Sequence, residues 1–147
     1  MQNFPFNPQY ELNSFEIILC EQQGDLFREC QYDFEVDALD FITKFMSSSL
    51  AAEYDRPVSS YHYLGIKSLG DCLIEENEIL RFKTEDEINP NVLYWVGYMF
   101  RYWACMGDLS KNIIEMCPIK KALICYPGYH CLDTPDAVRR LKDGATR

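Results

Sequence analysis

The sequence predicts a mainly α-helical fold: a single-domain compact helical bundle around a buried central helix at about residues 90–106. Apolar residues recur at three- and four-residue spacing in several segments. Two segments begin with a capping residue followed by proline, Asn89-Pro90 and Thr134-Pro135, as helices often do. The segment after Asn89-Pro90 is apolar nearly all the way round, which indicates a helix buried on most of its sides.

The length and composition fit one self-sufficient domain. The chain has 147 residues, of which 48% are hydrophobic and 14% aromatic, and this is too apolar for a disordered chain. It contains no internal repeat and no linker long enough to divide it. We therefore expect an irregular lead-in at 1–13, one helical domain at 14–143 and a short tail at 144–147.

The pattern of the first 34 residues is compatible with two structures. Pro5 and Pro8 make the lead-in irregular. Two apolar runs then flank Gln22-Gln23-Gly24-Asp25, and Gly-Asp between such runs favours a short β-hairpin over residues 14–34. Two short helices are the alternative, because periodicity alone does not separate the two structures.

The middle of the chain predicts two helices. The first runs from Asp37 to about Ala52, with an apolar stripe on one face, and Asp55-Arg56-Pro57 ends it. Ser59 or Ser60 can cap the second, which carries another apolar stripe and runs to about Glu76. An acidic connector follows through residues 85–87.

The central helix starts at Asn89-Pro90 and is closed by Gly107 as the residue after its C-cap. Ser110 or Asp108 begins a short helix, and Pro118 separates it from a segment at 119–125. Residues 126–128, Tyr-Pro-Gly, predict a turn. Thr134-Pro135 opens the last helix, which places Val138 and Leu141 inward and ends at Gly144.

Charge and targeting signals narrow the function. The net charge is −9, so direct binding of nucleic acid through a basic face is not expected. The acidic balance fits either plain solubility or attraction to a basic protein partner. No apolar run approaches the roughly 20 residues that cross a bilayer, and the first residues lack the pattern of a signal peptide. We expect a cytoplasmic protein that does not bind membranes.

The sequence contains no motif that indicates catalysis or a cofactor. Phosphate-binding glycine loops, nucleophile elbows and zinc-protease signatures are missing, so we expect no enzyme activity and no cofactor. The seven cysteines are an odd number without a Cys-x-x-Cys pair, which predicts reduced, buried thiols and no metal site. His130-Cys131 is the one place where a base adjoins a nucleophile, and burial would make such a thiol inert.

The aromatic face of the central helix holds the candidate partner-binding residues. Arg101 lies among tyrosines and tryptophans, and two interpretations stay open for it. It can stack on rings inside the core and pair with an acidic residue, or it can form part of a binding hot spot. The candidate contacts for a protein partner are Tyr94, Tyr98, Arg101, Tyr102, Glu75, Glu76, Glu78 and Asp133.

The segment Leu93-Tyr94-Trp95-Val96-Gly97-Tyr98-Met99-Phe100-Arg101-Tyr102-Trp103 resembles a family of small Firmicute-type bacterial proteins with a Tyr-Trp-x-Gly-Tyr-x-x-Arg-Tyr-Trp core. Ser110-Lys111-Asn112-Ile113 is similar to the family's following helix, and residues 129–135 are similar to its closing Tyr-His-Thr-Leu-Asp-Pro element. The resemblance covers roughly residues 36–143. In the closing element cysteine replaces threonine and one extra residue precedes the proline.

The resemblance implies a role beside toxins of the ADP-ribosyltransferase type. On that basis we expect an antitoxin-like, non-enzymatic protein-binding module whose partner is a basic toxin or enzyme, with a homodimer as a further option. The alternatives are an acidic inhibitor from a mobile element that mimics the charge of nucleic acid, and a small thiol-dependent enzyme using Cys131 or another cysteine.

Overall fold

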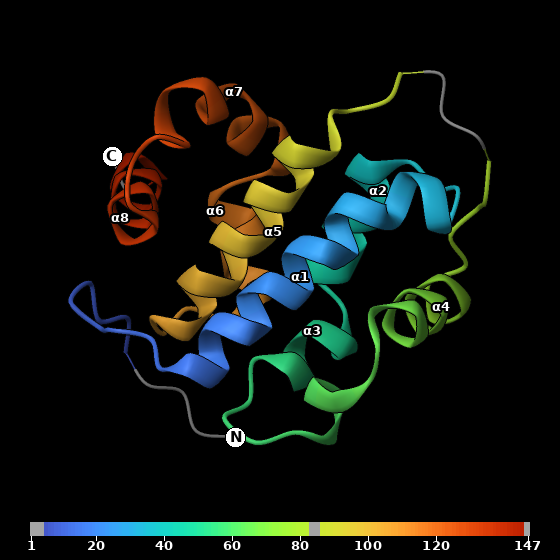
Figure 1. Ribbon diagram of the computed structural model, residues 1–147, viewed down its shortest axis with the longest axis horizontal. Coiled ribbons are helices and arrows are strands. Elements are labelled where there is room, and N and C mark those ends of the chain that lie inside the picture. The colour runs from blue at the N-terminus through green and yellow to red at the C-terminus, as the bar shows by residue number, and fades with distance from the viewer. Residues whose placement is uncertain (1–4, 83–85, 146–147) are drawn as a thin grey trace.

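The computed structural model describes residues 5–82 and 86–145. Within these residues the chain is mainly α-helical, with eight α-helices, one short 3-10 helix and no strand. The expected fold class is therefore confirmed. The first and longest helix, α1 (Ser14–Asp33), packs along α5 (Pro90–Cys105) in the middle of the molecule (Figure 1).

Residues 14–33 form neither a hairpin nor two short helices, because α1 is continuous through Gly24. A capping box starts it: Asn13 Oδ1 accepts a hydrogen bond from the backbone of Glu16 at 2.9 Å, and Glu16 Oε1 accepts one from the backbone of Asn13 at 3.0 Å. A Cβ at Gly24 would lie 2.8 Å from the Tyr94 ring. This glycine therefore serves close packing against α5 rather than a turn.

The segment expected as one helix from Asp37 to Ala52 is two helices, α2 (Ala38–Met46) and α3 (Ser49–Tyr54). Asp37 caps α2 by accepting a hydrogen bond from the backbone of Asp40 at 3.0 Å. Helix α2 ends at Met46 because the Ser48 hydroxyl caps a new helix by accepting a hydrogen bond from the backbone of Ala51 at 3.2 Å.

The next expected helix is also divided. Ser59 caps the 3-10 helix η1 (Ser60–Tyr63), and α4 (Ile66–Glu76) begins separately after Gly65. The central helix has the expected bounds, since Asn89 caps α5 and Gly107 follows its C-cap with a φ of 131°, in the left-handed region that glycine adopts without strain.

Three helices complete the chain: α6 (Ser110–Met116), α7 (Ile119–Tyr129) and α8 (Thr134–Ala145). The turn expected at residues 126–128 is wrong, because α7 continues through Pro127. Proline removes one backbone donor, and here it stands two residues before the helix end on an exposed side, where that loss costs least. Val138 and Leu141 of α8 are buried, as expected.

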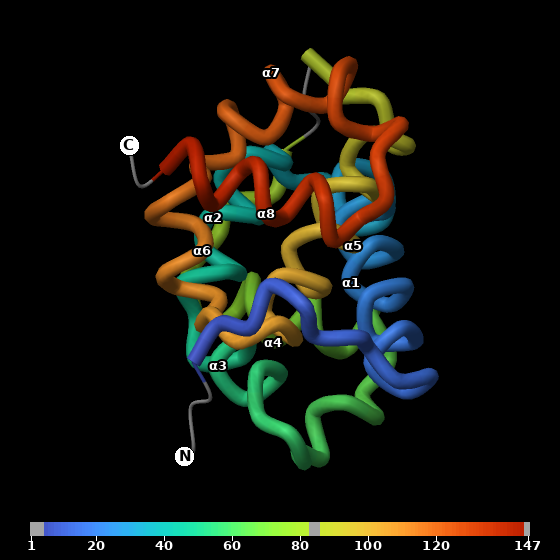
Figure 2. The backbone as a smooth tube through the Cα atoms, turned by 90° about the vertical axis from the view of Figure 1, so that its left-hand side faces the viewer, coloured from blue at the N-terminus to red at the C-terminus, as the bar shows by residue number. Residues whose placement is uncertain are grey.

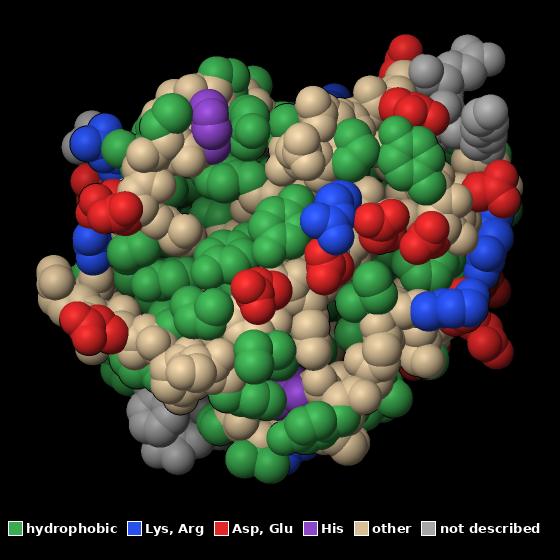
Figure 3. All heavy atoms as spheres, viewed as in Figure 1, with side chains coloured by type: hydrophobic (Ala, Val, Ile, Leu, Met, Phe, Trp, Pro, Cys, Tyr) green, Lys and Arg blue, Asp and Glu red, His purple; other side chains and the backbone are tan. Residues whose placement is uncertain are grey.

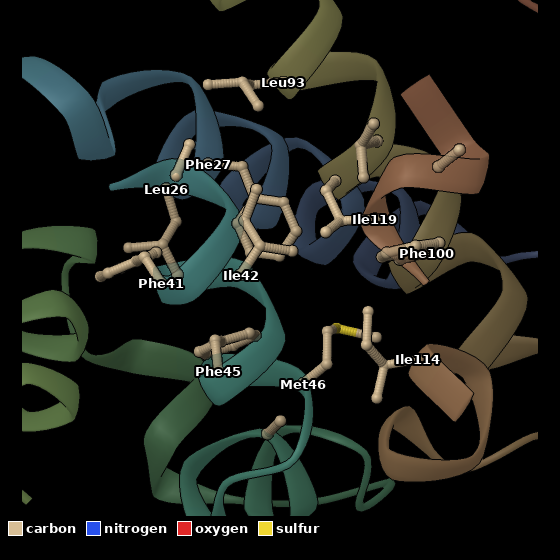
Figure 4. Close-up of a cluster of buried hydrophobic side chains, with 14 of the residues drawn as sticks. Leu26, Phe27, Phe41, Ile42, Phe45, Met46, Leu93, Phe100, Ile114 and Ile119 are labelled. Atoms are coloured by element: carbon tan, nitrogen blue, oxygen red, sulfur yellow. The ribbon is translucent and has the colours of Figure 1, made fainter. Parts of the chain in front are cut away.

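The helices surround the α1–α5 pair. Helices α6, α7 and α8 pack on α5, while α2 and α4 pack on α1 (Figures 1 and 2). The main core lies between α1, α2, α5, α6 and α7, where side chains such as Phe27, Phe45 and Phe100 meet (Figure 4). In the part of the chain that the structure describes, no helix combines the length and apolarity needed to cross a membrane.

Candidate protein-binding surface

Three tyrosines form a row along α5. Tyr94, Tyr98 and Tyr102 follow one another at four-residue spacing, so they lie on one face of the helix. Their neighbouring ring centroids are 6.1 Å and 6.4 Å apart, and all three side chains are half-buried. We call this row the tyrosine stripe.

The tyrosine stripe lies between two walls. Figure 3 shows hydrophobic side chains gathered over α5, in a hollow between α1 on one side and the α7–α8 pair on the other. On the α1 side, the Arg28 guanidinium lies 5.1 Å from the centre of the Tyr94 ring. On the α8 side, Arg139 is close enough to act on the hydroxyl of Tyr102. A basic side chain therefore lies beside the tyrosine stripe on each of its two sides.

Acidic residues of α1 border the tyrosine stripe. Burial raises the pKa of Tyr94, and the charges of Asp25 and Glu21 raise it further. Burial, together with Cys20 and Glu21, raises the pKa of Tyr98 to about 12. All of these hydroxyls therefore keep their protons at neutral pH and can donate hydrogen bonds to a partner.

Arg101 lies on the other side of α5, inside the molecule. Its side chain is 1% exposed, and Nη1 donates to Asp55 Oδ1 at 2.6 Å. Nε donates to Gln23 Oε1 at 2.9 Å, and the guanidinium lies 4.9 Å from the centre of the Tyr54 ring. The interpretation of Arg101 as a paired, ring-stacked core residue is therefore confirmed. The expectation that Arg101 contacts a partner at the surface is corrected, because its side chain is buried and its guanidinium bonds within the protein.

The Arg101 network joins four elements. Asp55 follows α3 and accepts from both the backbone and the hydroxyl of Ser110, the first residue of α6, at 2.9 Å and 2.6 Å. Gln23 of α1 also donates to the backbone carbonyl of Gly97 in α5 at 3.1 Å. Arg101 thus fixes how α5 sits on its neighbours, and with it the orientation of the tyrosine stripe.

The acidic candidates lie elsewhere. Glu75, Glu76 and Glu78 are exposed at the end of α4, and α1 separates α4 from α5 (Figure 1). Asp133 is exposed just before α8. The structure thus brings together Tyr94, Tyr98 and Tyr102 but not the acidic residues expected to act with them. Glu85, in the expected acidic connector, lies outside the described residues.

Sequence reasoning missed Glu21, Asp25 and Arg28, which border the tyrosine stripe from α1. A signal for them existed. Asn-x-x-Glu at 13–16 has the spacing of a capping box, and a helix starting there would have placed Glu21 and Asp25 one turn apart on one face. The Gly-Asp pair at 24–25 outweighed that signal because the same dipeptide is common in hairpins.

The thiols are less uniformly buried than expected. Cys20, Cys30 and Cys117 are buried, but Cys72 and Cys131 are exposed and Cys105 and Cys125 are partly exposed, so the expectation is wrong for these four. Cys125 still packs against the main core, and Cys105 lines a cavity at the end of α5.

His130 and Cys131 do meet. His130 Nδ1 bonds the carbonyl of Tyr126 at 2.7 Å, and Nε2 lies 3.6 Å from Cys131 Sγ. A carbonyl only accepts hydrogen bonds, so Nδ1 carries the proton of a neutral ring and Nε2 faces the thiol as an acceptor. Within residues 5–82 and 86–145 no group of three His, Cys, Asp or Glu side chains is placed to hold a metal ion.

A comparison of the chain with family models gave no match, and neither did comparisons with curated proteins and with solved structures.

Proposed function

We propose that this protein is a non-enzymatic protein-binding module, antitoxin-like, which uses the tyrosine stripe to cover a basic surface of a toxin or enzyme. One observation carries the proposal: three half-buried tyrosines, in a hollow, beside the carboxylates of Glu21 and Asp25. Tyrosine is enriched in interface hot spots, because its rigid ring buries a large area while its hydroxyl still bonds.

Charge supports a basic partner. The chain carries 23 acidic and 14 basic residues, and Glu21 and Asp25 border the tyrosine stripe on the α1 side, where Asp25 pairs with Arg28 and Glu21 forms no ion pair among the described residues. Complementary charge speeds encounter and selects among partners, while the buried aromatic contacts decide how long the complex lasts. The toxin identity rests on the resemblance of the α5 segment to antitoxin-associated proteins.

The proposal is tested with three tagged baits in a lysate of the source bacterium. Wild type and Tyr63→Ala should retain the same stoichiometric partner, because Tyr63 is an 80% exposed tyrosine on η1, away from the stripe. Tyr98→Ala should weaken its binding by about 30-fold or more, the effect of losing a hot spot of about 2 kcal/mol. Equal retention by Tyr98→Ala, or equal loss in Tyr63→Ala, would contradict the proposal.

The antitoxin part has its own test. The purified partner should transfer ADP-ribose from NAD, and one equivalent of this protein should inhibit it, with Tyr98→Ala inhibiting far less. If the partner has neither toxicity nor transferase activity, the antitoxin proposal is wrong, while the proposal of a protein-binding module still holds. Binding that disappears at moderate salt regardless of Tyr98 would favour charge mimicry instead.

One observation favours the thiol-dependent alternative: exposed Cys131 beside a histidine whose acceptor nitrogen faces it at 3.6 Å. Native alkylation tests it. If Cys131 reacts no faster than Cys72, which is also exposed, the histidine does not activate it and this alternative fails.

A further inference from the structure

A cavity of about 630 Å³ lies at one end of the molecule, away from the tyrosine stripe. It is formed by the segment before α1, the first turns of α1, the end of α3, the C-terminal turns of α5 and the loop between α5 and α6. Its volume falls in the range of about 300–1,000 Å³ that is typical of small-molecule sites. The space is therefore large enough for a ligand, and none of the three tyrosines of the stripe lines it.

Four aromatic side chains stand in the wall of this cavity. Phe6, Tyr10, Phe15 and Tyr54 all line it. Two of these rings already carry a cation in the fold: Arg101 lies 4.9 Å from the centre of the Tyr54 ring, and Lys142 Nζ lies 3.7 Å from the centre of the Phe6 ring. The negative faces of such rings attract positive groups.

The charged residues of the wall are neutralised, with one exception. Asp55 pairs with Arg101 at 2.6 Å, Asp108 with Lys142 at 2.7 Å and Arg56 with Glu53 at 3.3 Å. These pairs leave the wall without net charge apart from a single remaining carboxylate.

Glu16 is that carboxylate. Its Oε1 accepts from the Tyr10 hydroxyl at 2.7 Å and from the Asn13 backbone at 3.0 Å, and both donors are neutral. Among the described residues no lysine, arginine or histidine forms an ion pair with it. The cavity therefore combines aromatic walls with one uncompensated negative charge.

We propose that this cavity binds an organic monocation, an amine with an aromatic or aliphatic body, whose ammonium group faces Glu16 while its body packs on the rings of Tyr10 and Phe15. An anion would be repelled by Glu16, because the other charged groups of the wall are already paired, and a neutral ligand would gain the ring contacts but no charge interaction. The protein's net charge of −9 also favours a cation at longer range.

Three probes of nearly equal shape test the ligand class: 2-phenylethylammonium, 2-phenylethanol and 3-phenylpropanoate. Each is titrated into the full chain at pH 7 and low salt, with binding measured by ligand-observed NMR and calorimetry. The ammonium should bind about tenfold or more tightly than the alcohol, corresponding to about 1.4 kcal/mol, and the carboxylate most weakly. Equal binding of all three, preference for the carboxylate, or no binding of any would overturn the proposal.

Variants then locate the site. Glu16→Gln retains an acceptor for Tyr10 and Asn13, so α1 should still start correctly, and the ammonium should lose its advantage over the alcohol to within about twofold. Glu11→Gln removes an exposed carboxylate outside the cavity and should change nothing.

Ala104→Phe, which adds a ring to the cavity wall, should weaken all three probes, while Tyr98→Ala should leave them unaffected. Helical circular dichroism and thermal unfolding verify each fold. An unchanged ammonium preference in folded Glu16→Gln would reject Glu16 as the recognition group, and unchanged binding in folded Ala104→Phe would reject the cavity.

Discussion

Arg101 and Asp55 form a buried ion pair, with side chains 1% and 4% exposed. Burial acts to lower the pKa of Arg101, but Asp55 and Cys105 raise it, and the net shift is upward. The Arg101 guanidinium therefore stays charged. Because water does not reach it, the ion pair and hydrogen bonds within the protein must offset the cost of burying this charge. Such a pair specifies one arrangement of its helices more clearly than it adds stability.

Asp55→Ala should destabilise the protein by about 3–5 kcal/mol, because it leaves the Arg101 charge buried without a counter-charge. Glu53→Ala is the matched control, since the side chains of the Glu53–Arg56 pair are 36% and 48% exposed and its loss should cost only about 0–1 kcal/mol. Urea unfolding followed by circular dichroism measures both. Similar losses in the two variants would show that Arg101 reaches solvent.

Buried thiols and tyrosines predict a loss of stability at alkaline pH. Burial, and after it the charge of Asp37, raises the pKa of Cys30 from 9.0 to about 12, and burial raises the pKa of Cys117 to about 12 as well. The folded state holds these protons above pH 9 whereas the unfolded state releases them. Their contribution is therefore complete below pH 9 and is lost as the pH rises through 12.

Each such thiol should lower the free energy of unfolding by about 1.4 kcal/mol per pH unit between pH 9 and 12. Urea midpoints at pH 8, 9, 10 and 11 measure this slope. In Cys30→Ala the slope of the free energy of unfolding against pH should be smaller by the contribution of one thiol, whatever the variant's stability at pH 8. A slope identical to that of wild type would mean that Cys30 is not the titrating group.

At the scale of the helix, the contact between α1 and α5 depends on small residues. A Cβ added at Gly97 would lie 2.5 Å from the backbone oxygen of Gln23, so the two helix backbones are in direct contact there. The position of Tyr94 over Gly24 follows from the same close approach. The tyrosine stripe is therefore set by glycines on both helices as well as by Arg101.

Gly97→Ala should destabilise the protein by about 1–3 kcal/mol, because a backbone atom cannot move aside as a flexible side chain can. Gly128→Ala in α7 is the control. A Cβ there meets nothing within 4 Å, so helix propensity should make the change neutral or stabilising by up to about 1 kcal/mol. Thermal and urea unfolding compare the two. Tolerance of alanine at position 97 would mean that the helices can separate at no cost.

The elements that the sequence predicts correctly are those with their own local signals. Asn89-Pro90 and Gly107 mark both ends of α5, and the spacing of Val138 and Leu141 predicts the inward face of α8. Residues 14–33 could not be assigned in the same way, because Gly24 has two possible roles. In the local sequence it favours a turn, whereas in the folded protein it lets α1 pack closely against α5. The choice depends on Tyr94, 70 residues further along the chain.

The candidate surface could likewise be predicted only in part: its tyrosines could be, but the residues that border them could not. The spacing of Tyr94, Tyr98 and Tyr102 places them on one helix face, and α5 was correctly bounded. Their acidic border on α1 required the correct structure of residues 14–33. Whether Arg101 pointed inward depended on Asp55, a residue 46 positions away that the sequence marked only as the end of a helix.

At the scale of the whole molecule, charge opposes folding. The net charge is −9, and three of the carboxylates, Glu75, Glu76 and Glu78, crowd the C-terminal end of α4, where the helix dipole is negative. This arrangement disfavours the folded state locally. Carboxylates that cost stability yet stay exposed are available to contact a basic partner, although these three lie apart from the tyrosine stripe.

Neutralising these three residues together, as Glu75→Gln, Glu76→Gln and Glu78→Gln, should therefore raise the midpoint of thermal unfolding at low salt by a few degrees, since about 1 kcal/mol shifts a domain of this size by roughly 2–8 °C. Sodium chloride should stabilise wild type by screening the same repulsion, and should stabilise the triple variant less. Scanning calorimetry at pH 7 in low and high salt measures both effects. If the triple variant is less stable than wild type at low salt, the carboxylates pair with cations in the fold, and their availability to a partner would have to be abandoned.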